Sequence, residues 1–173
     1  MTDSAARILL IGYGNPGRRD DGLGPQLAAE FEALALPGVA VDADYQLTVE
    51  DAAALAEHEV VIFADAAVAG STPFYFHRLE PQDGVTFSTH SITPAAVLGL
   101  ARDLFGARPA AYVLGIRGYE FDEFGETLSA GARANLAAAV QFLQQALVTG
   151  SFTEFGCGPA ETPADRTRGN GDT

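Results

Sequence analysis

The chain has 173 residues, of which 47% are hydrophobic and 19% charged, which is typical of one globular domain. Ten Lys and Arg residues stand against 23 Asp and Glu residues, a net charge of −13, and such a surface repels the phosphates of nucleic acid. We therefore expect no nucleic acid as a partner. The apolar runs are much shorter than a bilayer span, so we expect no membrane either.

The ends of the chain bear on its compartment. Residues 1–7 show no basic segment followed by an apolar stretch, so we expect no secretion signal. The single cysteine, Cys157, can form no internal disulfide, which suits a reducing environment. We therefore predict a cytoplasmic protein, and the sequence indicates nothing about its oligomeric state.

Strand and helix patterns alternate in the first half of the chain. Residues 7–12 form a short apolar run that predicts a strand buried on both faces. From Leu23 apolar residues recur every three or four positions, which predicts a helix that ends at Pro37-Gly38. Further on we expect a strand at 39–42, a helix at 48–56 with Thr48 as its N-cap, and a very apolar strand at 60–65.

The second half continues the alternation and then loses it. Residues 74–79 predict an edge strand, and residues 110–116 predict a buried one. Thr93-Pro94 is expected to open a helix, and Ser129 to cap the last one. From residue 151 onward Gly, Pro, Thr and Asp dominate without any apolar period, so we predict a disordered tail over 151–173.

This pattern predicts an α/β fold in a single domain spanning residues 1–150. We expect a three-layer αβα sandwich, with a twisted, mostly parallel sheet of about five strands. Residues 74–79 would be its one antiparallel edge strand. In open parallel sheets, ligands bind in the crevice at the carboxyl ends of the strands, so functional residues are expected in the loops there.

The loop after the first strand has two interpretations. Gly12-Tyr-Gly14-Asn-Pro-Gly17 matches the dinucleotide-binding pattern G-x-G-x-x-G, with Asp42 or Asp44 as its acidic partner. A proline and four charged residues, however, separate the glycines from the helix that would bind the phosphates. We therefore interpret the loop as presenting Asp20 and Asp21. A non-catalytic module that binds a dinucleotide or a metal remains the alternative.

Asp21, Asp65 and His90 each follow a different predicted strand, so they can meet at one edge of the sheet. Two carboxylates and one imidazole suit a borderline divalent ion such as Ni²⁺ or Zn²⁺. Structural roles stay open, because Asp65 could cap a helix or pair with Arg117, and a lone histidine is more often structural. The sequence contains neither H-E-x-x-H nor G-x-S-x-G, which excludes a zincin and disfavours a serine hydrolase.

The segment Gly12-Tyr-Gly14-Asn15-Pro-Gly-Arg-Arg-Asp20-Asp21-Gly22-Leu-Gly24 resembles the opening motif of the hydrogenase maturation endopeptidases, G-x-G-N-x-x-x-x-D-[DE]-G-x-G. Residues 63–66, 89–98 and 114–116 are similar to the family's second acidic site, its histidine segment and the strand that follows. The resemblance covers the chain from about Arg7 to Val148.

The resemblance implies an α/β peptidase that removes a C-terminal extension from the large-subunit precursor of a [NiFe] hydrogenase. Cleavage follows nickel insertion, and the nickel carried by the precursor is the recognition signal. The implied catalytic and nickel-contacting residues are Asp21, Asp65 and His90. The implied supports of the substrate loop are Gly14, Asn15, Asp20 and Gly22.

Two points stay open within this resemblance. Some members have Glu at the position of Asp21, whose side chain is one methylene shorter. A metal could polarise the scissile carbonyl and activate a water, or Asp21 or Asp65 could act as general base while nickel positions the substrate. A peptidase of this fold with another substrate is a third hypothesis, which activity on a nickel-free precursor would favour.

Overall fold

The computed structural model describes residues 7–84 and 92–159. Within these ranges one sheet has five strands in the order β2-β1-β3-β5-β4. β4 pairs with β5 antiparallel, and the other neighbours pair parallel. The strands are β1 (Ile8–Tyr13), β2 (Val39–Asp44), β3 (Val60–Ala67), β4 (Phe74–Leu79) and β5 (Ala110–Arg117). The prediction of a mostly parallel sheet with residues 74–79 as its antiparallel edge is confirmed.

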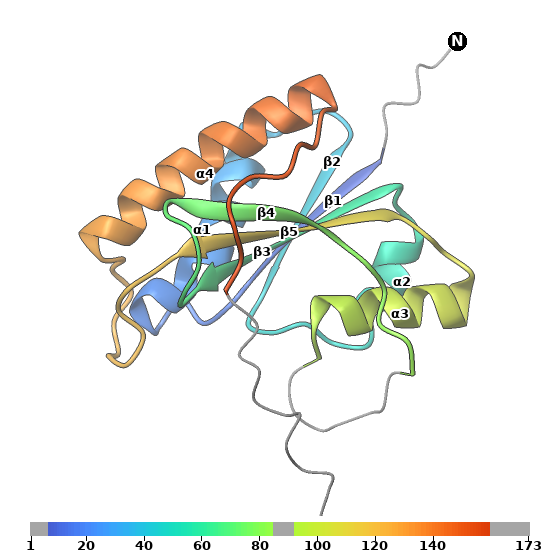
Figure 1. Cartoon of the computed structure of the whole chain (residues 1–173), viewed down its shortest axis with the longest axis horizontal. Helices are drawn as coiled ribbons and strands as arrows, with labels where there is room; N and C mark the ends of the chain where they lie inside the picture. The colour runs from blue at the N-terminus through green and yellow to red at the C-terminus, as the bar shows by residue number, and fades with distance from the viewer. Residues whose placement is uncertain (1–6, 85–91, 160–173) are drawn as a thin grey trace, which may run out of the picture.

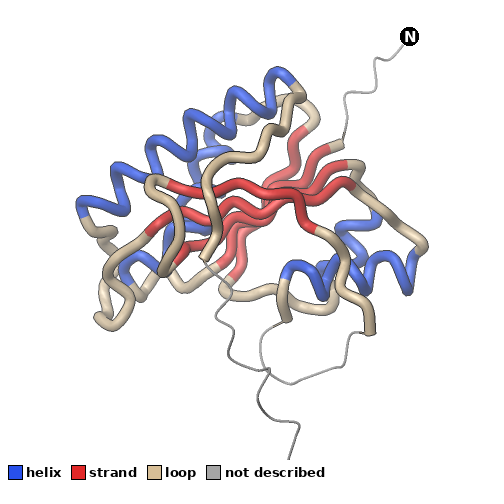
Figure 2. Tube along the Cα trace, viewed as in Figure 1, coloured by secondary structure: helices blue, strands red, loops and turns tan. Residues whose placement is uncertain are grey.

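Helices cover both faces of the sheet, as Figures 1 and 2 show. One face carries α1 (Leu23–Leu34) and α4 (Ala130–Thr149), and the other carries α2 (Asp51–Ala56) and α3 (Pro94–Phe105). Side chains alternate between the faces along each strand. Ile62 therefore packs toward α1 and α4, whereas Val61 and Phe63 pack toward α2 and α3. The predicted three-layer α/β sandwich is confirmed.

The caps show why the helices begin where they do. Thr93 accepts the N–H of Ala96 at 3.2 Å, and Ser129 accepts the N–H of Ala132 at 3.2 Å, so both predicted N-caps are confirmed. Helix α2 begins at Asp51 and not directly after Thr48, which was predicted as its cap. The Asp51 carboxylate instead accepts the N–H of Thr48 at 2.7 Å and closes the preceding turn.

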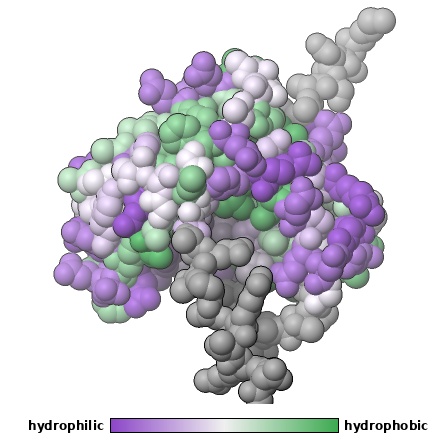
Figure 3. Space-filling model, in the orientation of Figure 1, coloured by the Kyte–Doolittle hydropathy of each residue, from purple (hydrophilic) through white to green (hydrophobic). Residues whose placement is uncertain are grey.

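The surface mixes polar and apolar residues, and Figure 3 shows hydrophilic side chains prominent on the side of the molecule that carries α3. Helix α4 is 20 residues long. Neither it nor any other helix in the described ranges combines the length and the apolar character that crossing a bilayer requires.

The segment after α4 corrects one prediction. Residues 151–159 run along β4 (Figure 1), where Phe76 and Phe155 exchange both backbone hydrogen bonds, with N···O distances of 2.7 and 2.9 Å. The Phe155 ring lies 4.8 Å from that of Phe74. The prediction of disorder was wrong for these nine residues, because the edge strand offers unpaired backbone groups and the rings of Phe152 and Phe155 pack on Tyr112 and Phe74. The domain extends at least to Pro159, and residues 160–173 lie outside the described ranges.

We expect Phe155→Ala to lower the free energy of unfolding by about 1–2 kcal/mol, because the ring is only half-buried but packs on two aromatic neighbours of the core. Phe105→Ala is the matched control. That ring, at the end of α3, is 54% exposed, and its loss should change stability by less than about 0.5 kcal/mol. Urea denaturation measures both variants, and equal effects would contradict the assigned role of the segment.

Candidate active site

Glycines bring the start of α1 directly against the sheet. A Cβ atom on Gly12 would lie 2.1 Å from the carbonyl oxygen of Gly24, and one on Gly24 would lie 2.6 Å from that of Ala64. No side chain fits in either place. The loop that follows β1 is therefore held against the carboxyl end of β3, the strand that carries Asp65.

The loop folds around Asp21. Gly14 has φ = +142°, and a Cβ atom there would lie 2.1 Å from the carbonyl oxygen of Asp21. The backbone N–H of Asn15 donates to the Asp21 carboxylate at 2.9 Å, and the Asn15 side chain accepts the N–H of Gly17 at 2.9 Å. On the far side Gly22 lies against Pro16. These contacts fix Asp21 from both directions.

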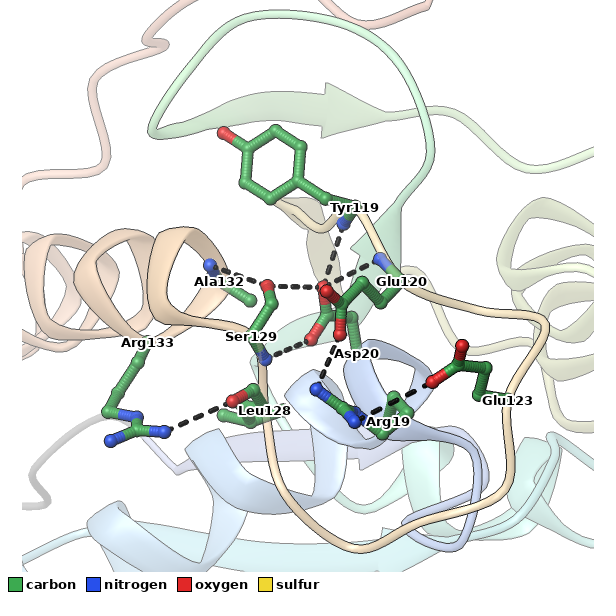
Figure 4. A network of polar contacts seen from close by, with 9 residues as sticks. All are labelled: Arg19, Asp20, Tyr119, Glu120, Glu123, Leu128, Ser129, Ala132 and Arg133. Atoms are coloured by element: carbon green, nitrogen blue, oxygen red, sulfur yellow. Dashed lines mark hydrogen bonds and ion pairs between the residues drawn. The ribbon is translucent and has the colours of Figure 1, made fainter.

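Asp20 belongs to a different environment, shown in Figure 4. It lies in η1 (Arg19–Gly22) and is fully buried. One carboxylate oxygen accepts the N–H groups of Tyr119 and Glu120, at 2.8 and 2.9 Å, and the other accepts the N–H of Ser129 at 2.7 Å. The Ser129 hydroxyl donates at 2.7 Å to the first of these oxygens, the one that also accepts from Tyr119 and Glu120. Asp20 thus ties η1 to the loop between β5 and α4.

Burial alone would raise the pKa of Asp20, but the hydrogen bonds from Ser129, Tyr119 and Glu120 outweigh it and hold the pKa below its usual value. Asp20 is therefore ionised at neutral pH, with its acceptor positions occupied by protein donors. It supports the loop and does not offer a free carboxylate to a ligand.

Asp65 lies inside β3, two residues before its end, and not at the strand end where it was expected. Burial raises its pKa to about 6. The N–H of Ala66, which donates to the carboxylate at 2.7 Å, acts in the opposite direction and lowers the pKa. The negative charge of Asp21 also raises this pKa, and a hydrogen bond from the Tyr13 hydroxyl lowers it. The structure thus brings Asp21 and Asp65 close enough for their charges to interact.

The ion pair with Arg117, one structural alternative for Asp65, is not formed within the described ranges. Arg117 donates to the backbone carbonyl oxygens of Val68 and Gly118, and its guanidinium lies over the Tyr119 ring at 5.0 Å from the centroid. It forms no ion pair with Asp65 among the described residues. Asp65 is therefore a half-buried carboxylate that forms no ion pair with a cationic side chain of the described residues.

His90 lies outside the described residues, so its predicted approach to the two carboxylates stays a prediction. Among the described residues no group of three His, Cys, Asp or Glu side chains could hold a metal ion. Asp21 and Asp65 supply two oxygen donors, to which a third ligand would have to be added.

Solved structures give the fold a name. The [NiFe] hydrogenase maturation protease HycI from Thermococcus kodakarensis KOD1 is similar with a TM-score of 0.65 and 20% identity, over 84% of this chain and 95% of that chain. Hydrogenase 2 maturation peptidase from Thaumarchaeota archaeon SCGC_AB-539-E09 is similar with a TM-score of 0.61 and 25% identity, over 82% and 98% of the two chains. The chain has the fold of the hydrogenase maturation proteases. The resemblance predicted from the glycine loop is thereby confirmed.

The hydrogenase maturating endopeptidase HybD from E. coli shares this maturation-protease fold, with a TM-score of 0.65 and 22% identity over 87% of this chain and 97% of that one. No model of a protein family matches the sequence, and no curated protein matches it either. At these identities the likeness is one of fold.

Two tyrosines near Asp65 escaped the sequence-based interpretation. Tyr13 ends β1 beside Asp65, and Tyr75 of β4 lies across Gly115 of β5. Burial and the Asp65 charge raise the pKa of both phenols, so both keep their protons at neutral pH. The sequence pattern that could have indicated these tyrosines is the two-residue alternation of side chains along the strands. It identifies which residues lie near Asp65 only when the pairing register of the strands is known.

Exposed apolar side chains surround the same edge of the sheet. The loops after β2, β3 and β5 expose four of them, with exposed fractions of 67%, 66%, 48% and 86% for Tyr45, Val68, Tyr119 and Phe124. A surface pocket lined by Gly14, Pro16 and Tyr45, among others, lies beside the Asp21 loop. Exposed apolar groups gathered at one edge are typical of a surface that contacts another protein.

Proposed function

We propose that this chain is a cytoplasmic endopeptidase that removes the C-terminal extension of a [NiFe] hydrogenase large-subunit precursor after nickel insertion. The observation that carries the proposal is the pair of Asp21 and Asp65 at the carboxyl edge of a maturation-protease fold, with the pKa of Asp65 raised to about 6. Perturbed carboxylates in a loop-lined edge are typical of catalytic sites.

The proposed chemistry is hydrolysis with Asp65 as general base. A carboxylate with a pKa of about 6 is ionised at neutral pH and still basic enough to take a proton from an attacking water. The base can then return this proton to the leaving amine. The proposed contacts of the nickel carried by the precursor are Asp21, Asp65 and His90. Oxygen and imidazole donors suit that ion.

The proposed partner is a protein, and the surface supports this. Large exposed side chains such as Phe124 and Tyr45 lie in the loops around the carboxylates. The net charge of −13 favours a precursor that presents a basic surface. The glycines of the first loop would also let an extended C-terminal segment approach the backbone.

The deciding experiment incubates the purified protein with large-subunit precursors in nickel-loaded and nickel-free form, and follows the loss of the extension by mass spectrometry. We expect cleavage of the nickel-loaded precursor only. Cleavage of both forms would indicate a peptidase with a different recognition signal. Cleavage of neither would overturn the proposal, and titration with NAD(H) and with free Ni²⁺ would then test the binding-module alternative.

A further inference from the structure

Tyr75 and Asp65 occupy one row across the sheet. Asp65 of β3 pairs in register with Gly115 of β5, and Gly115 pairs with Tyr75 of β4. Residues two positions away on these strands, Phe63 and Val113, pack toward α2 and α3. By strand alternation the side chains of Asp65 and Tyr75 lie on this same face, and the only residue between them has no side chain.

Gly115 lets the Tyr75 ring lie flat across β5. A Cβ atom on Gly115 would be 2.2 Å from Cζ of Tyr75 and 2.6 Å from its hydroxyl oxygen. The hydroxyl therefore lies directly over the backbone of β5, next to the strand that carries Asp65. Asp65 is close enough for its charge to act on this hydroxyl.

The ring is also held on its other side. Gly158, in the segment that runs along β4, faces the ring, and a Cβ atom placed on it would lie 3.7 Å from Cε2 of Tyr75. Its N–H donates to His77 Nε2 at 3.1 Å, and the His77 ring lies 5.4 Å from that of Tyr75. The segment 151–159 thus lies beside the ring, on the side of Tyr75 away from Gly115.

The two tyrosines near Asp65 differ in what their hydroxyls do. Tyr13 uses its proton in a hydrogen bond to Asp65. The hydroxyl of Tyr75 donates to no acceptor within the described ranges. A hydroxyl packed over Gly115, with no acceptor among the described residues and beside a carboxylate that can act as base, has the properties needed to bind an oxygen on which negative charge develops.

We propose that Tyr75 is a further catalytic residue, whose hydroxyl donates a hydrogen bond to the carbonyl oxygen of the scissile peptide bond. This inference rests on the proposed function. As water adds to the carbonyl carbon, the oxygen gains negative charge and the hydrogen bond from Tyr75 strengthens. The bond weakens again when the carbonyl re-forms and the amine leaves, so Tyr75 keeps its own proton throughout. Gly115 and the segment 151–159 position the ring for this contact.

The test is single-turnover cleavage of nickel-loaded precursor by Tyr75→Phe, which removes the hydroxyl and keeps the ring. We expect the cleavage rate at saturating enzyme to fall about 100-fold, because the lost donor acts in the transition state. The enzyme concentration that gives half-maximal rate should change less than about 3-fold. Tyr112→Phe is the matched control, since Tyr112 lies on the same strand as Gly115 but faces α4, stacked on Phe76. Its rate should equal that of the wild type.

Four outcomes would overturn the inference. A cleavage rate of Tyr75→Phe within about 3-fold of the wild-type rate shows that the hydroxyl does not act in the reaction. Equal losses of cleavage rate in Tyr75→Phe and Tyr112→Phe would indicate a structural effect. So would a lowered midpoint of thermal unfolding in Tyr75→Phe, if it accounts for the loss of rate. If the wild-type protein cleaves no precursor, both this inference and the proposed function are wrong. If the wild type is active and Tyr75→Phe is equally active, only the role of Tyr75 is wrong.

Discussion

The Asp65→Asn variant is expected to cleave nickel-loaded precursor about 1,000-fold more slowly than the wild type. It is also expected to be more stable, with a higher free energy of unfolding at pH 7. The loss follows because an amide cannot accept the proton of the attacking water. The gain in stability follows because the native carboxylate is half-buried, and this burial raises its pKa from 3.8 to about 6. A residue that improves the reaction at the cost of the fold is typical of an active site.

The pH dependence of this gain has a defined sign. Between about pH 4 and pH 6 the folded state of the metal-free protein holds the Asp65 proton, and the unfolded chain has released it. The folded state is therefore favoured at low pH and loses this advantage as pH rises through the window. At pH 7 the charged group costs about 1–3 kcal/mol, at the lower end because the carboxylate is partly exposed. Below pH 4 the two proteins should differ little.

Urea denaturation with a chelator present, at pH 4 and at pH 7, measures the stability difference between the wild type and Asp65→Asn. Asp44→Asn is the control, because Asp44 is an exposed carboxylate at the end of β2 on the same edge, and its removal should change neither the rate nor the pH dependence. His90→Ala should also lose cleavage. Full activity in Asp65→Asn would contradict the assignment of the base, and a pH-independent difference would contradict the origin of the stability effect.

Asp20→Ala should lower the free energy of unfolding by about 3–5 kcal/mol, the largest loss of stability that we expect from any single change in the site. The carboxylate accepts the N–H groups of Tyr119, Glu120 and Ser129 and the Ser129 hydroxyl. Alanine leaves these part-buried donors without their acceptor, and each such donor costs about 1–3 kcal/mol at most.

Asp21→Ala is the matched control for Asp20→Ala, because the two residues are adjacent in η1. Among the described residues Asp21 accepts one hydrogen bond, from Asn15, so its loss should cost less than about 1.5 kcal/mol. Its effect should fall on cleavage of the precursor. Urea denaturation and the cleavage assay on both variants separate the roles, and equal losses of stability would show that the Asp20 network does not carry the loop.

Local signals in the sequence determined most of the fold. Apolar runs placed the strands, the three- and four-residue period placed α1, and Thr93 and Ser129 marked the starts of α3 and α4. These features depend on residues within one or two turns of each other, so they can be recognised without knowing the partner elements. The glycine loop and its acidic pair were recognised for the same reason, since all their residues lie within one short segment.

The roles of individual residues depended on contacts between distant parts of the chain. Asp20 and Asp21 are adjacent and chemically identical, yet only Asp20 is satisfied by donors about 100 residues away, in the loop before α4. Tyr75 reaches the row of Asp65 because β4 pairs antiparallel with β5 in one particular register. The polar segment 151–159 is ordered because β4 offers it an unpaired edge. Register, burial and backbone pairing arise only when the elements pack together, so tertiary structure alone decided which carboxylate holds the loop and which is left with few protein donors among the described residues.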